Sequence, residues 1–336
     1  MRATVPDPAP ASTPTLRPTL HPSEHARLMA KVARMYHERG LRQSEIGDEL
    51  HISQARVSRL LKRAAEVGIV RVTVTIPGGL HTDLEDRLQD EYGLSDAVVV
   101  ESDDPGDLRT LGAAAADLLD ATLQGAETIG ISSWSASLLA AVDALRPTNK
   151  PVASAVVQLV GGIGDPRVQV EATRLLTRLA GATGAAPIFL PAPGLLGSPA
   201  ARQSLAADPA VLQVTTRWSA LTTALVGIGA LEPSPLLQQS GNGLTADDQD
   251  RLRAAGAVGD VCLRFFDEHG GPVASDLDDR IIGIAPDVFR AIPRRIAVAG
   301  GLRKVAALRG ALRGGWLTVL VTDAGTARAL LEDAEG

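Results

Sequence analysis

The feature that most constrains the fold is a regular alternation that runs through most of the chain. From Asp83 onward, short β-branched apolar runs such as "DAVVVE", "TIGIS" and "RIAVAGG" alternate with Ala/Leu-rich stretches of helical spacing. Strands that are apolar on both faces and are separated by helices are typical of a parallel sheet covered on both sides. The sequence therefore predicts an α/β domain with a mostly parallel sheet, and further runs of this kind are "SAVVQLV", "ALVGIG", "GDVCLRFF" and "LTVLVTD".

Length and charge indicate a second, smaller domain. The chain has 336 residues, of which 45% are hydrophobic and only 3% aromatic, so it can build one large and one small core. The net charge of -6 is unevenly distributed, because residues 24–72 carry ten Lys/Arg against six Asp/Glu and the residues after them carry 21 against 32. A small basic piece is attached to a large acidic one, so the acidic total does not argue against nucleic acid.

Three segments follow from the pattern along the chain. Residues 1–23 contain six prolines among Ala, Thr and Ser, which predicts a disordered tail. Helical spacing begins at His25, the alternating "IVRVTVTI" predicts a short strand at 69–76, and "PGG" breaks the chain. We therefore expect a first domain over residues 24–79 and a second over residues 80–336.

Cysteine usage and hydropathy bear on location. The single cysteine, Cys262, excludes a disulfide framework and points to a reducing compartment, and its apolar neighbours predict a place in the core. No apolar run reaches the length of a membrane span, and the first 22 residues lack the hydrophobic stretch of a signal peptide. We expect a cytoplasmic protein with no membrane partner.

The segment "QSEIGDELHISQARVSRLLKRA" has the spacing of a helix-turn-helix. Ile46 would face inward from the first helix and Val57 from the second, with the small Gly47 where the helices cross and Ser53 as N-cap. His51 occupies the turn and tolerates a left-handed conformation better than most residues. The residues predicted to contact DNA are Gln43, Ser44, Ser53, Gln54, Ala55, Arg56, Ser58, Arg59, Lys62 and Arg63.

The alternative for this segment is an ordinary helical hairpin with a solvated basic face. Core spacing, cap and one-sided basic residues together favour DNA binding, with Gln and Arg near the helix start suited to base edges and the later Arg and Lys to phosphates. A module of this size reads few base pairs. We therefore expect a homo-oligomer that binds operator DNA with two-fold symmetric or repeated half-sites.

Two strand-to-helix junctions of the large domain are equipped to hold an anion. In "TIGISSWSASLLAAV" hydroxyls and backbone N–H groups precede a helix, and in "RIAVAGGLRK" two glycines precede Lys304. Both loops would lie at the carboxyl ends of parallel strands, where ligands usually bind. The alternatives are an ordinary serine cap and an ordinary tight turn. The predicted effector-binding residues are Ser132, Ser133, Trp134, Ser135, Ser137, Gln158, Asp260, Gly300, Gly301 and Lys304.

Other site classes find little support. Neither loop matches a P-loop or the GxGxxG dinucleotide motif, and the six histidines show no metal-ligand spacing. No convincing set of nucleophile, histidine and acid is present. We expect no metal, no cofactor and no catalytic residue.

The quoted segments, together with "VVQLVGGIG", "FLPAPGLL" and "ALVGIGALEPSPLLQQSG", closely resemble the SorC family of sugar-responsive transcriptional regulators. The resemblance covers about residue 25 to the end. It implies an N-terminal helix-turn-helix, a large Rossmann-like α/β effector domain similar to sugar-phosphate isomerases, and a dimer or tetramer. By motif, the Ser132–Ser137 loop and Gly300, Gly301 and Lys304 would hold a phosphate, while Asp260 and Gln158 would face the sugar.

Three functions remain to be distinguished. The favoured one is a transcription regulator whose operator affinity is controlled by a sugar, polyol or sugar phosphate. The alternatives are a phosphosugar isomerase with an appended DNA-binding module, for which Asp260 is the available base, and a large domain that only oligomerises.

Overall fold

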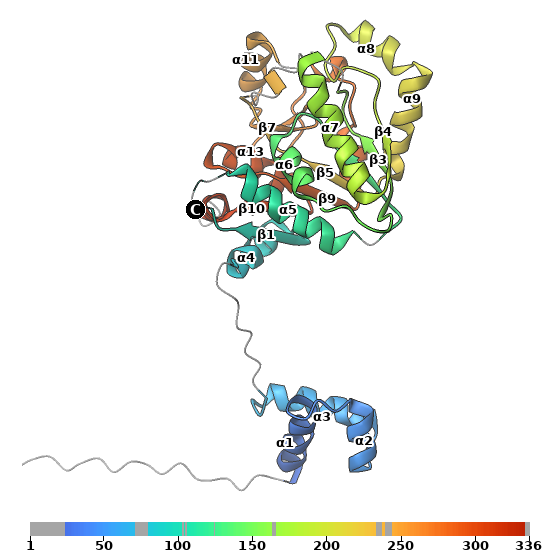
Figure 1. Cartoon of the computed structure of the whole chain (residues 1–336). Coiled ribbons are helices and arrows are strands. Elements are labelled where there is room, and N and C mark those ends of the chain that lie inside the picture. The colour runs from blue at the N-terminus through green and yellow to red at the C-terminus, as the bar shows by residue number, and fades with distance from the viewer. Residues whose placement is uncertain are drawn as a thin grey trace, which may run out of the picture. The chain divides into compact units, whose positions relative to one another are not determined.

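The computed structural model describes residues 24–70, 80–102, 104, 106–123, 125–162, 166–232, 237–238 and 244–332. Contacts divide the chain into two compact units, one up to Thr75 and one from Ile76 (Figure 1). The expected tail over 1–23 and most of the strand expected at 69–76 lie outside the described residues.

The described residues of the N-terminal unit form three helices, α1 (Glu24–His37), α2 (Gln43–Leu50) and α3 (Gln54–Glu66). Its core contains Met29, Val32, Ile46, Val57 and Leu60, so the inward positions expected of a helix-turn-helix are buried. Helices α2 and α3 cross at Gly47, where a Cβ atom would lie 2.8 Å from the carbonyl oxygen of Ile52. This close approach explains the glycine.

The turn between α2 and α3 has the predicted chemistry. His51 is left-handed, with φ 53°. The Ser53 hydroxyl accepts a hydrogen bond of 3.3 Å from the Arg56 N–H, which caps α3. At the start of α2, where Arg42 provides no Ser or Thr cap, the Glu45 carboxylate accepts the Arg42 N–H at 2.7 Å.

The larger unit is built on a seven-stranded sheet in which every neighbouring pair is parallel. In spatial order its strands are β1 (Asp96–Val100), β10 (Val319–Asp323), β9 (Arg294–Val298), β5 (Thr223–Val226), β2 (Glu127–Ile131), β3 (Ala153–Gln158) and β4 (Ala186–Ile188). Consecutive residues such as Val156 and Val157 belong to different apolar clusters, one on each face. The sheet is therefore buried on both faces, as its near-continuous apolar strands predict.

Helices cover both faces of this sheet (Figure 1). One face packs against α5 (Leu108–Thr122), α6 (Ala136–Ala144) and α7 (Pro166–Thr183), and the opposite cluster includes residues of α4 (Thr82–Tyr92), α13 (Val305–Arg313) and α14 (Ala324–Glu332). The other described helices are α8 (Pro199–Ala206), α9 (Pro209–Thr215), α11 (Ala246–Ala254), α12 (Pro286–Arg290), and the 3₁₀ turns η1 (Thr216–Ala220), η2 (Asp278–Arg280) and η3 (Leu302–Lys304).

One predicted strand is a hairpin instead. The segment "GDVCLRFF" forms β7 (Gly259–Val261) and β8 (Arg264–Phe266), which join β6 (Gly229–Ala230) in a small antiparallel sheet. The chain reverses because Cys262 (φ 54°) and Leu263 (φ 62°) are both left-handed, as a tight two-residue hairpin turn requires. Cys262 is buried as expected, but it lies in this turn and not within a strand.

Candidate functional site

A cavity of about 500 Å³ lies beyond the carboxyl ends of β2, β5 and β9. Its wall is formed by the loops that follow these strands, by the start of α5 and by the β7–β8 turn. This is the edge of the sheet at which a parallel α/β fold usually binds its ligand. Eight of the ten predicted effector residues line it, namely Ser132, Ser133, Trp134, Ser135, Ser137, Asp260, Gly300 and Lys304.

The serine hydroxyls of the first loop are already engaged within the protein. Ser132 accepts the Gly227 N–H at 3.3 Å, Ser135 caps α6 by accepting the Leu138 N–H, and Ser137 donates to the Val298 carbonyl at 2.6 Å. The N–H groups at the start of a helix have no partner within that helix, so the beginning of α6 offers backbone donors at the cavity wall. The backbone N–H groups at the start of α6 and the hydroxyl of Ser132, which only accepts a hydrogen bond among the described residues, are therefore the groups of this loop that can donate to an anion.

Gln158, which the resemblance implied would face the sugar, is not among the residues that line the cavity. Its side chain is 5% exposed, and both ends of its amide are bonded. The Nε2 group donates to the Ser133 hydroxyl at 2.8 Å, and Oε1 accepts the Leu190 N–H at 2.9 Å. Gln158 thus holds Ser133 from behind and stabilises the loop.

Asp260 and Lys304 bring opposite charges to the cavity. Asp260 is 8% exposed and its Oδ2 accepts the Leu263 N–H at 2.9 Å across the hairpin turn. Burial raises the pKa of its carboxyl to about 6, although that hydrogen bond and the nearby Lys304 act in the opposite direction. Burial, assisted by the neighbouring Arg303, lowers the pKa of Lys304.

Among the described residues, Lys304 makes no ion pair within 4.0 Å. A partly buried ammonium with no paired anion favours an anionic ligand, because the ligand charge offsets the cost of desolvating the cation. The side chain enters the cavity from η3, beside Gly300. The helix α13 starts directly after Lys304, and the short turn η3 lies between the glycines and this helix.

Trp134 lines the cavity but is only 5% exposed, so protein atoms cover most of the surface of its ring. Its backbone is left-handed, with φ 62°, which is an outlier for a bulky residue and is frequent at functional sites. Its indole N–H is buried and has no hydrogen-bond partner among the residues that the structure describes.

Sequence reasoning missed several parts of the site. Gly301 was predicted to contact the effector but does not line the cavity, and its N–H donates to the carboxylate of Asp323. Gly106 lines the cavity and was not predicted. Asp323, which contacts Gly301, was not predicted either. The available signal was the ending of "LTVLVTD", where an acidic residue closes an apolar strand. Apolar wall residues that were also missed are Leu108, Leu111, Val160, Ile228, Leu237 and Leu263.

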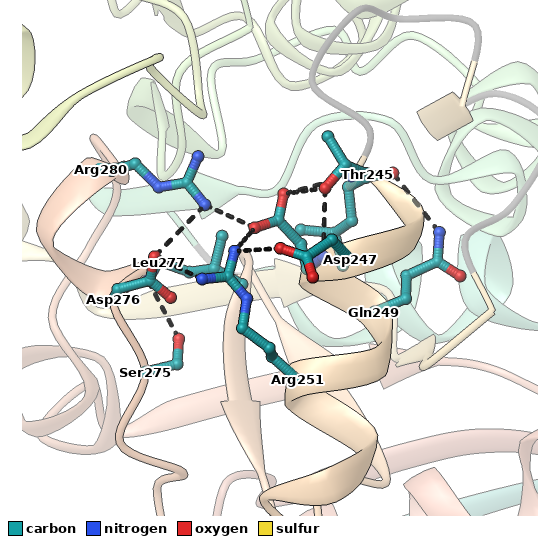
Figure 2. Close-up of polar contacts among 10 residues, drawn as sticks. Thr245, Asp247, Gln249, Arg251, Ser275, Asp276, Leu277 and Arg280 are labelled. Carbon is teal, nitrogen blue, oxygen red and sulfur yellow. Dashed lines mark hydrogen bonds and ion pairs between the residues drawn. The ribbon is translucent and has the colours of Figure 1, made fainter.

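A separate charge network anchors α11 outside the cavity wall (Figure 2). Asp248 is 2% exposed and its Oδ1 contacts Arg251 at 2.8 Å and Arg280 at 2.7 Å, while Thr245 donates its hydroxyl to Oδ2. Arg264 makes the equivalent link for the hairpin, with Asp278 at 2.8 Å. Charged pairs thus fasten the elements that surround the β7–β8 turn.

In the N-terminal unit, the residues predicted to bind DNA lie on α2, on α3 and in the turn between them. All ten are exposed except Gln43, which is half-buried. Arg63 pairs with Glu66 at 2.9 Å, whereas no described residue forms an ion pair with Arg56 or Arg59. Lys62 has no such partner among the described residues either, so three exposed basic side chains on the helix that follows the turn are available to a nucleic acid.

A helix-turn-helix in the same chain as an α/β domain with a ligand cavity defines a ligand-responsive transcriptional regulator. A family model described as a putative sugar-binding domain matches residues 79–332, and one described as region 4 of sigma-70 matches residues 29–66. The chain belongs to the SorC family of transcriptional regulators, which carry this sugar-binding domain. The family and the fold class predicted from the sequence are thereby confirmed.

Known relatives resemble the chain over most of its length. The deoxyribonucleoside regulator of Bacillus subtilis (strain 168) is 32% identical and covers 91% of this chain and 98% of its own. The crystal structure of the full-length sorbitol operon regulator SorC from Klebsiella pneumoniae has a TM-score of 0.70, with 29% identity over 91% of this chain and 98% of that one. The putative sugar-binding domain of the regulator DeoR from Pseudomonas syringae pv. tomato has a TM-score of 0.60, with 39% identity over 75% and 99%.

Within the described part of the chain, every helix is too short or too polar to cross a lipid bilayer.

Proposed function

We propose that the cavity binds a sugar, polyol or sugar phosphate, and that this ligand changes the affinity of the helix-turn-helix for its operator. The observation that carries the proposal is the position of Lys304. It is a partly buried cation without an ion-pair partner in the described structure, and it lines the same cavity as the start of α6. Together they suit a phosphate or another anionic group. Asp260 would accept hydrogen bonds from ligand hydroxyls.

The DNA-binding role is assigned to the surface of α2 and α3. Gln54 and Arg56, near the start of α3, would reach base edges, while Arg59, Lys62 and Arg63 would contact phosphates. The names of two relatives, deoxyribonucleoside regulator and sorbitol operon regulator, support a role in gene regulation. A homodimer or homotetramer would bind two-fold symmetric or repeated half-sites, and the bacterial cytoplasm, where DNA lies, would be its compartment.

Control of transcription requires that the ligand bind one state of the oligomer more tightly than another. The test is a titration of pentose, hexose and polyol phosphates, each beside its unphosphorylated form, against binding of an operator fragment at fixed salt. A specific effector is expected to change operator affinity by about 5- to 150-fold. A full panel that stabilises the protein without changing operator affinity would contradict the regulatory role.

We propose further that the chain is not an enzyme. The raised pKa of Asp260, about 6, is the observation that most favours a catalytic base and hence an isomerase. The decisive assay incubates the full chain with ribose 5-phosphate or glucosamine 6-phosphate and follows product by NMR. We expect no turnover, and a rate that disappears in the Asp260→Asn variant would establish catalysis instead.

A further inference from the structure

We infer that Asp323 is a positioning residue of the effector site, acting through two loops of the cavity wall. The inference rests on the proposed function, because it concerns how the anion-binding side of that cavity is held. Asp323 is the last residue of β10 and is 1% exposed. Its carboxylate does not line the cavity, so any effect on the ligand must pass through the residues that it contacts.

The carboxylate joins two wall loops to the start of a helix. Oδ2 accepts the N–H of Gly301 at 2.9 Å and the N–H of Gly106 at 3.1 Å. Thr326 donates its hydroxyl to Oδ2 and its backbone N–H to Oδ1, both at 2.8 Å, which caps α14. One buried side chain therefore fixes the loop before α5, the loop after β9 and the helix after β10.

The hydrogen bonds of Asp323 are linked through Gly301 to Lys304, the cation of the site. The carbonyl of Gly301 accepts the backbone N–H of Lys304 at 2.9 Å, which closes the turn η3. Gly301 thus donates to Asp323 on one side and holds the backbone of Lys304 on the other. The position of the ammonium in the cavity depends on this short chain of hydrogen bonds.

The glycines of both loops fit this role. Gly106 and Gly301 are left-handed, with φ 86° and 94°, and a Cβ on Gly106 would lie 3.0 Å from the Cα of Gly301. A Cβ on Gly300 would lie 2.2 Å from Oδ2 of Asp323. The paired glycines of "AVAGGLRK" therefore allow the backbone to approach this carboxylate, whereas the sequence suggested that they let it approach a ligand.

The charge of Asp323 is balanced by hydrogen-bond donors. Among the described residues no cation lies within 4.0 Å of it, and four donor contacts satisfy its two oxygens. An asparagine has nearly the same volume but keeps only one acceptor oxygen, so it cannot accept the glycine N–H groups at Oδ2 and the Thr326 N–H at Oδ1 together, while the Gly301 N–H keeps the Thr326 hydroxyl as a second acceptor at 2.8 Å. The Asp323→Asn variant therefore weakens the link between the loops and α14 with little change in packing.

The experiment is a double-mutant cycle on the full chain with Asp323→Asn, Lys304→Ala and both together. The probes are inorganic phosphate and ribose 5-phosphate, with unphosphorylated ribose as the neutral reference, and the readout is Kd by calorimetry. Asp323→Asn is expected to weaken the two anionic probes at least about 10-fold relative to ribose, and to have no further effect once Lys304 is removed. The milder Thr326→Val should weaken them less, and keeps the test available if the first variant folds poorly.

The matched control is Asp248→Asn. Asp248 is also a buried carboxylate at the start of a helix, where it belongs to the capping box of α11, but it contacts Arg251 and Arg280 and does not line the cavity. This control should lower the melting temperature and leave the ratio of phosphate to ribose affinity unchanged.

Each other outcome is decisive. If Asp323→Asn binds phosphate as the wild type does, or if its effect adds to that of Lys304→Ala, or if Asp248→Asn weakens phosphate equally, then Asp323 has only a structural role. The proposed function survives all three results. If the wild-type chain binds none of a full sugar and sugar-phosphate panel, the proposed function itself fails and the inference falls with it.

Discussion

The amide of Gln158, which does not line the cavity, donates a hydrogen bond of 2.8 Å to the hydroxyl of Ser133, which does. The Ser133 hydroxyl in turn donates a hydrogen bond of 3.3 Å to the Val160 carbonyl. The end of β3 and the loop after β2 are thereby locked together. The loop that begins α6 is held in place before any ligand binds.

Replacing Gln158 with Leu should therefore lower the stability of the fold without changing which ligand is preferred. The change leaves the buried Leu190 N–H without its acceptor, at a cost of about 1–3 kcal/mol in the free energy of unfolding. Denaturant unfolding measures the loss, and a ligand panel should show weaker binding in an unchanged order of preference. A changed order would indicate that Gln158 contacts the ligand directly.

Removing the basic side chains of α3 should weaken DNA binding without loss of fold. Arg56→Ala and Arg59→Ala remove exposed cations, each expected to reduce operator affinity by about 10- to 100-fold. The measurement is operator binding at several salt concentrations. As a control, Arg253→Ala removes an exposed arginine of α11 that pairs with Asp250, and it should leave operator binding unchanged.

Removing the cation of the cavity should separate sensing from DNA binding. Lys304→Ala is expected to weaken an anionic effector by at least about 10-fold, because the buried ammonium and the ligand charge stabilise each other. Operator binding without effector should remain near the wild-type value. Equal effector response in wild type and variant would remove Lys304 from the site.

Asp260 should make stability depend on pH in a definite direction. Its pKa is raised from 3.8 to about 6 in the folded protein, so between these values the folded state binds more protons than the unfolded state. Stability is therefore lost as the pH rises through this window, by up to about 3 kcal/mol for the fully ionised group. Asp260→Asn should melt at a higher temperature than wild type at pH 7.5.

That difference should vanish toward pH 4, where the carboxyl is protonated in both states. Asp250→Asn, at an exposed position of α11, serves as the control and should show no such trend. A melting-temperature difference that is constant across this pH range would contradict the raised pKa.

The contact at Gly47 should make the helix-turn-helix intolerant of even one methyl group. Gly47→Ala places a Cβ 2.8 Å from the Ile52 carbonyl, and the forced shift should cost about 1–3 kcal/mol and reduce operator binding. Gly181→Ala is the matched control, because nothing lies within 4 Å of its Cβ and α7 gains helix propensity there. Comparable destabilisation by both would refute the packing explanation.

The parts of the molecule that sequence could predict are those governed by local periodicity. The parallel sheet follows from apolar strands separated by helices, and the helix-turn-helix follows from Ile46, Val57 and the Ser53 cap. The cavity also lies where strand ends predicted it, since the loops after β2 and β9 meet at one edge of the sheet.

What sequence could not predict depends on the direction of individual hydrogen bonds and on rare backbone conformations. The β7–β8 turn has Cys262 and Leu263 at positive φ, where glycine or asparagine would have been the expected signal. The hydroxyl of Ser137 and the amide of Gln158 were equally plausible as ligand contacts until their protein partners were known. Asp323 and Gly301 are 22 residues apart, and only the fold brings them together.

The cavity is lined by two kinds of side chain, polar ones that are hydrogen-bonded within the protein and aliphatic ones. Several polar wall residues are fixed by hydrogen bonds within the protein, whereas Leu108, Ile228 and Leu237 contribute aliphatic side chains from three separate segments of the chain. Aliphatic side chains form no hydrogen bonds, so exchanging them leaves the polar network intact. The protein is thus a suitable starting point for engineered biosensors. Substitutions at these three positions should change which ligand binds, while the residues proposed to hold the anion and the helix-turn-helix remain unchanged.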